Sequence, residues 1–99
     1  MAAKSCRKIE VIMVADQILS VIGAAKVPVS IADIARSTGI STDSCFRQIG
    51  TMEEIRWVTK IGAGYILGGR ISELRARKIA TLEAQRDAID KQLTELQEA

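Results

Sequence analysis

Two helix-start signals stand eleven residues apart in the segment VSIADIARSTGISTDSCFRQIGTMEEI, and this spacing constrains the fold more than any other feature of the chain. Ser30 is a good N-cap, and Asp33, three residues later, completes a capping box. Gly39 favours the left-handed conformation that ends a helix, and Ser41 caps the next one. The segment therefore predicts a helix to about Thr38, a tight glycine turn and a second helix, which together form a helix-turn-helix.

The second of these helices has one apolar face and one polar face. Cys45, Ile49 and Met52 recur at helical spacing and form the stripe expected to be buried. The outward positions are Asp43, Ser44, Phe46, Arg47, Gly50 and Thr51. A large apolar side chain such as Phe46 on an otherwise polar face usually marks a contact surface. We therefore expect this outer face to meet a partner.

Further elements are predicted on both sides of the helix-turn-helix. The stretch WVTKIGAGYIL has β-favouring residues around two glycines, which predicts a hairpin, and a hairpin after such a helix is the wing of a winged helix. Upstream, an amphipathic helix is predicted from about Lys8 to Ala24. Its apolar arc covers about half of the helical wheel, so it is expected to pack on two sides. Trp57 is expected beneath the wing.

The sequence from about Gly69 to Ala99 predicts one long helix without internal glycine or proline. Apolar residues alternate at steps of three and four, as at the a and d positions of a coiled coil. The a series is Ile79, Arg86 and Leu93, and the d series is Leu82, Ile89 and Leu96. The polar Arg86 is expected to fix the register. We predict homodimerisation through these six residues; the alternative is packing on the first helix of the same chain, and both can hold.

The predicted fold class is therefore mostly α with a small β-hairpin wing, a winged helix-turn-helix followed by a long C-terminal coiled-coil helix. The predicted organisation is a frayed N-terminus over 1–7, the winged helix-turn-helix over 8–68 and the dimerisation helix over 69–99. The basic start and apolar run of residues 4–25 mimic an export signal, but Glu10 and Asp16 interrupt the run and fit an amphipathic helix better. No membrane contact is expected, and the localisation predicted from cysteine usage is cytoplasmic.

Composition argues against several classes of function. The chain has no histidine, and Cys6 and Cys45 lie far apart, so neither a metal site nor a cofactor is expected. Glu53 and Glu54 are adjacent on a helix with no base or phosphate loop nearby, which argues against an enzyme. Residues 1–70 hold nine basic and six acidic side chains, whereas the rest hold five and six. The first part of the chain can therefore meet a polyanion.

With these elements in this order, the sequence resembles the DNA-binding domain of the IclR family of bacterial transcription regulators. SIADIARSTGIS resembles that family's second helix and turn, and CFRQIGTMEEI resembles its recognition helix, with Arg47 and Thr51 where the family usually has Arg and Thr. WVTKIGAGYILGGRISEL resembles the wing and the return from it. The resemblance implies double-stranded DNA as partner. The family's large effector-binding domain has no counterpart in the residues after the wing, so no small-molecule effector is expected.

The residues predicted to contact DNA gather on the recognition helix and the wing. They are Ser41, Thr42, Asp43, Ser44, Phe46, Arg47, Gln48, Thr51, Arg56 and Lys60. Arg47 can bind phosphate or guanine, Phe46 can contact a thymine methyl group, and Gln48 can bind a purine. Asp43 repels phosphate, but it can accept a hydrogen bond from a cytosine amine.

The function predicted from the sequence is sequence-specific DNA binding by a homodimer, in the role of a transcriptional repressor. Two alternatives stay open. A winged helix can be a protein-interaction module in a larger assembly, which the few basic residues of the recognition helix favour. It can also bind DNA architecturally, in replication or partition of a plasmid or phage genome.

Overall fold

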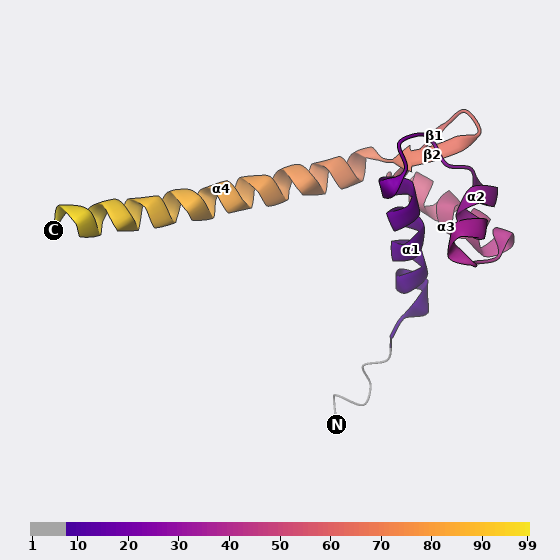
Figure 1. Ribbon diagram of the computed structural model, residues 1–99, viewed down its shortest axis with the longest axis horizontal. Coiled ribbons are helices and arrows are strands. Elements are labelled where there is room, and N and C mark those ends of the chain that lie inside the picture. The colour runs from indigo at the N-terminus through magenta and orange to yellow at the C-terminus, as the bar shows by residue number, and fades with distance from the viewer. Residues whose placement is uncertain (1–7) are drawn as a thin grey trace, which may run out of the picture. The chain divides into compact units, whose positions relative to one another are not determined.

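The computed structural model describes residues 8–99; the segment predicted to fray, 1–7, lies outside the described residues. The elements in chain order are α1 (Glu10–Ala24), α2 (Ile31–Thr38), α3 (Thr42–Glu54), β1 (Val58–Ile61), β2 (Gly64–Leu67) and α4 (Gly69–Glu98) (Figure 1). The predicted fold class is confirmed. The chain divides into two compact units, of which the first ends at Gly69 and the second comprises Arg70–Ala99.

Helix α2 begins and ends as its capping residues predict. The Ser30 side chain accepts a hydrogen bond from the Asp33 N–H at 3.1 Å. At the other end Gly39 has a φ of 75°, and its N–H donates to the Ala35 carbonyl at 2.9 Å. Glycine adopts this left-handed conformation without the steric cost that a Cβ imposes, so the helix stops here.

The hydroxyl group of Thr38 stabilises the turn that follows, and its hydrogen bonds were not predicted from the sequence. Thr38 Oγ1 donates to the Ile34 carbonyl at 2.8 Å and accepts from the Ile40 N–H at 3.2 Å. Ser41 then caps α3 by accepting from the Ser44 N–H at 3.1 Å. These local bonds satisfy backbone groups at the helix ends and fix the path of the chain between α2 and α3.

The wing is an antiparallel hairpin in which Val58 pairs with Leu67. Its two-residue turn has Gly62 at a φ of 60°, as the first central position of a type II′ turn requires. The connector before α2 adds a short third pairing that was not predicted. The Val29 N–H donates to the Tyr65 carbonyl at 3.0 Å, and the Tyr65 N–H donates back at 2.9 Å. The wing is therefore fastened to the start of α2 as well as to α3.

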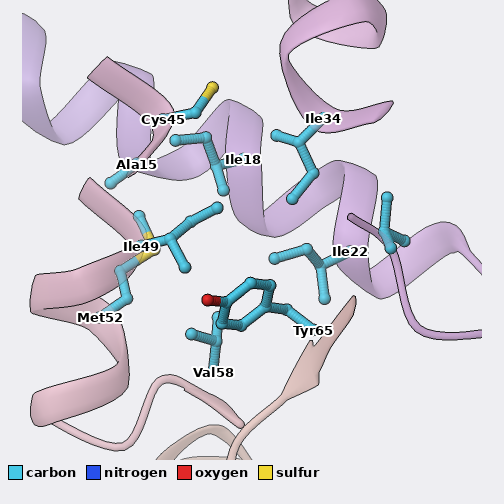
Figure 2. Packing of buried hydrophobic residues seen from close by; sticks show 10 residues of the cluster. Ala15, Ile18, Ile22, Ile34, Cys45, Ile49, Met52, Val58 and Tyr65 are labelled. Carbon is cyan, nitrogen blue, oxygen red and sulfur yellow. The ribbon is translucent and has the colours of Figure 1, made fainter. Parts of the chain in front are cut away.

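The core lies where the three helices and the hairpin converge (Figure 2). Its buried residues are Ala15, Ile18, Ile22, Val29, Ile34, Cys45, Ile49, Met52, Val58 and Tyr65. Aliphatic side chains dominate, as the scarcity of aromatic residues predicts. Burial raises the pKa of the Cys45 thiol above its ordinary value, which keeps this cysteine protonated and unreactive at neutral pH. The predicted stripe of α3 is thus its buried face.

Helix α1 packs on the core along one side only. Its first turns leave Val11 and Ile12 62% and 65% exposed. They flank an apolar groove of about 360 Å³ between α1 and α3, in which Trp57 also lies. Trp57 packs partly against the core, near the start of the wing. The second apolar side of α1 is therefore present as predicted, and no other part of residues 8–69 covers it. Its burial by a partner stays a prediction.

Helix α4 forms the second unit by itself. It begins at Gly69, the residue that the sequence indicates, and runs without interruption to Glu98. None of its residues is buried within the chain, and the six predicted seam positions are all exposed. Within residues 8–99, no helix is both long and apolar enough to cross a lipid bilayer.

Candidate nucleic-acid interface

The anchoring of α3 determines which of its side chains reach solvent. Cys45, Ile49 and Met52 fix one face against the core. Because successive residues turn by about 100°, the opposite ridge carries Asp43 and Arg47. Both side chains are well exposed. The predicted contact residues of this helix therefore share one element whose orientation is set by the core rather than by a flexible loop.

An ion pair connects the two charges of this ridge. Arg47 Nε lies 3.3 Å from Asp43 Oδ2, one helical turn away, and the two side chains are 72% and 80% exposed. Exposed pairs of this kind contribute about 0.3–0.5 kcal/mol, so a phosphate group can displace the carboxylate at little cost. Oppositely charged residues four positions apart on a helix commonly pair, so the sequence held a signal for this ion pair, although it was not predicted.

Phe46 is the large apolar residue of the same surface. It lies next to Arg47 in sequence, on one flank of the ridge, and is 63% exposed. Exposure of a large apolar side chain to water is unfavourable, and a contact with a base or another protein would remove Phe46 from water.

Gln48 and Thr51 lie on the opposite flank, towards α1. Together with Val11, Ser44 and Arg47 they line a shallow depression of about 300 Å³. The Thr51 hydroxyl donates to the Arg47 carbonyl at 3.2 Å, within the helix. The structure thus divides the predicted contact residues of α3 into an outer ridge and a flank that α1 borders. The proximity of Val11 was not foreseen, because it depends on how α1 packs.

Arg56 occupies the turn between α3 and β1 in an unusual conformation. Its φ is 67°, a left-handed value that is uncommon for a residue with a side chain. A Cβ placed on Gly69 would lie 2.7 Å from Arg56 Nη2, and one on Gly68 would lie 2.4 Å from the Arg56 carbonyl oxygen. The two glycines therefore make room for Arg56. This close approach ties the end of the wing to the end of α3, and no local sequence signal reports it.

Lys60 lies on β1, in register with Tyr65 of β2. Whereas Tyr65 is buried, Lys60 is exposed, close to the tip of the hairpin. Its ammonium group is thus available on the wing, on a different element from Arg47. Across residues 8–99 no three metal-binding side chains gather in one place.

Solved structures of transcription regulators share this fold. An IclR transcriptional regulator from Silicibacter sp. is 19% identical over 74% of this chain and 29% of its own, with a TM-score of 0.67. An IclR transcriptional regulator from Alicyclobacillus acidocaldarius is 23% identical over 73% of this chain and 30% of its own, with a TM-score of 0.68. The resemblance predicted from the sequence is confirmed at the level of the fold. The chain spans less than a third of the length of either regulator.

A third match covers nearly all of both proteins. The activation domain of the phage T4 transcription factor MotA is 21% identical over 90% of this chain and 88% of its own, with a TM-score of 0.55. No protein-family model matches the sequence, and no curated protein does. The matches therefore establish the winged-helix fold and leave the partner to be argued from the surface.

Proposed function

We propose that this winged-helix chain binds double-stranded DNA as a homodimer, with α3 entering the major groove, and that it acts as a transcriptional repressor in the cytoplasm. The observation that carries the proposal is the outer surface of α3. A rigidly anchored helix presents an arginine on its outer ridge and an exposed phenylalanine on the adjoining flank. Residues 1–70 hold nine basic and six acidic side chains. Such a helix fits the width of the major groove.

Each proposed contact follows from the chemistry of its side chain. Arg47 exchanges Asp43 for a phosphate or for the acceptor edge of guanine. Phe46 contacts a thymine methyl group. Hydrogen bonds come from hydroxyl groups and one amide: those of Ser41, Thr42, Ser44, Thr51 and Gln48. Lys60 on the wing neutralises a neighbouring phosphate, and Arg56 contributes less because its guanidinium lies beside Gly69.

Dimerisation through α4 would give the protein two recognition helices. A symmetric dimer of this kind reads two half-sites about 34 Å apart, or a multiple of that distance. Bound at a promoter, it would block access of other proteins, and this is why we assign repression.

Arg47→Ala is expected to weaken binding of the dimer to a selected DNA site by at least about 30-fold, because it removes one contact from each half-site and each bidentate contact is worth roughly 1–3 kcal/mol. The matched control is Arg77→Ala, which removes the same charge from α4 and lies outside the winged helix. Band-shift titrations at one fixed salt concentration measure both. Equal affinities of the two variants and the parent would remove α3 from the DNA contact.

A protein-interaction module is the second candidate, and the apolar groove between α1 and α3 favours it. Val11 and Ile12 are exposed beside this groove, and most of the residues that line it are apolar. A partner helix with an apolar face would fit such a surface. Binding of a protein partner is distinguished from DNA binding by its weak response to salt.

A further inference from the structure

We infer that two copies of the chain pair through α4 in the parallel orientation and in register; the inference rests on the homodimer proposed above and adds its geometry. The seam is defined here as Ile79, Leu82, Arg86, Ile89, Leu93 and Leu96. Its five apolar members are 42% to 76% exposed in the single chain. A helix of 30 residues with this stripe and no buried residue requires a covering surface, and a second copy offers the same stripe.

The position of Arg86 distinguishes the two orientations. In the parallel arrangement each seam residue meets its own counterpart, so the two Arg86 side chains share one layer and the other five layers are wholly apolar. In the antiparallel arrangement that aligns the same residues, Arg86 meets Ile89 of the second copy, and this mismatch occurs twice. A single polar layer at an a position is the device that fixes register in parallel pairs. Ile79 at a followed by Leu82 at d favours two strands over three or four.

Charges beside the seam favour the same orientation. In a parallel pair, Lys78 at a g position faces Glu83 of the second copy, at the following e position, and symmetry provides this pair twice. In the antiparallel pair, Glu83 instead faces Asp90 of the second copy, a like-charge contact that Arg86 offsets only in part. The remaining flanking positions along the seam are uncharged: Ala76, Gln85, Gln92 and Gln97. Among the flanking charges, the Lys78–Glu83 pair therefore favours the parallel orientation. The two Arg86 side chains, which share one layer in that orientation, repel each other and offset this preference in part.

Parallel pairing has a direct consequence for DNA binding. It brings the two Gly69 ends of α4 together, so both winged helices are attached at the same end of the pair. Antiparallel pairing would attach them at opposite ends of a helix about 45 Å long. Two recognition helices joined at one end suit adjacent half-sites on one duplex.

Charge exchange in the full chain tests the orientation. At low salt, Lys78→Glu and Glu83→Lys are each expected to raise the dimer dissociation constant about tenfold, because two attractive pairs become repulsive. The double variant K78E/E83K is expected to restore the parent value, since it rebuilds the pair with the signs exchanged. Lys91→Glu, at an outward position with the same change of charge, is the control. Sedimentation equilibrium measures all five proteins.

A terminal cross-link provides the second measurement. In a Cys6→Ser background, which leaves only buried Cys45, Ala99→Cys is expected to form an interchain disulfide in glutathione buffer, because parallel α4 helices end side by side. An antiparallel dimer would form no such disulfide, would be insensitive to Lys78→Glu and would be tightened by Glu83→Lys. This result would overturn the inference about orientation but would leave the homodimer intact. A parent chain that sediments as a monomer at every concentration would overturn the homodimer itself.

Discussion

Ile49→Ala is expected to lower the free energy of unfolding of the winged-helix unit by about 3–4 kcal/mol. Ile49 is fully buried on the inner face of α3, and it lies among core side chains of α1 and the hairpin (Figure 2). Removal of its outer carbon atoms leaves a cavity that close-packed neighbours fill only in part. Because small domains are stable by only about 5–15 kcal/mol, a loss of this size takes a large share of the total.

Fluorescence of Trp57, the single tryptophan, follows unfolding of this unit in urea without a contribution from α4. Ile61→Ala is the matched control, since Ile61 is 47% exposed on β1, and its loss is expected to cost less than about 1 kcal/mol. Similar shifts in midpoint for the two variants would contradict the arrangement of the core. A lower midpoint for Ile49→Ala alone would support it.

Replacement of two seam residues by serine, Leu82→Ser with Ile89→Ser, is expected to make the protein monomeric and to weaken DNA binding by at least about 100-fold. Both side chains lie exposed on the seam in the single chain, so the substitutions leave no cavity within the winged-helix unit. The loss of affinity has a different origin from that of Arg47→Ala. A dimer binds its second half-site at a high effective concentration, and a monomer forfeits this gain while it keeps every contact of one half-site.

Ala80→Ser with Ala84→Ser is the control, because it makes two similarly polar changes on α4 outside the seam. Sedimentation gives the oligomeric state, and anisotropy with a two-site duplex gives the affinity. Unchanged Trp57 fluorescence would show that the winged helix remains folded in both variants. A seam variant that still dimerises would point to the exposed side of α1 as the interface.

The features that sequence analysis predicted correctly are those that depend on neighbours in the chain. Ser30, Gly39 and Ser41 act on backbone groups only three or four residues away, so the sequence alone reveals the ends of α2 and the start of α3. The buried stripe of α3 follows from helical spacing in the same way. The hairpin turn at Gly62 also depends only on residues that are close in the sequence.

The features that escaped prediction depend on packing between distant segments. The pairing of Val29 with Tyr65 and the left-handed Arg56 beside Gly68 arise only when the hairpin closes over the start of α2 and the end of α3. The border that α1 makes with Gln48 and Thr51 is of the same kind. Of the candidate site, the placement of most predicted contact residues on one helix was predictable, whereas their division into ridge and flank was not.

The central claim is that paired winged helices bind DNA through its phosphates, and a salt titration tests it most directly. Anisotropy of a labelled random-sequence duplex is measured against salt concentration, with sedimentation of the same protein in parallel. Arg47 and Lys60 from two copies would neutralise about four phosphates, with a smaller share from Arg56, so we expect a slope of about −4 for the logarithm of the binding constant against that of salt, with a dimer in solution. No binding at about 50 mM salt, or binding that salt leaves unchanged, would contradict the claim and favour a protein partner.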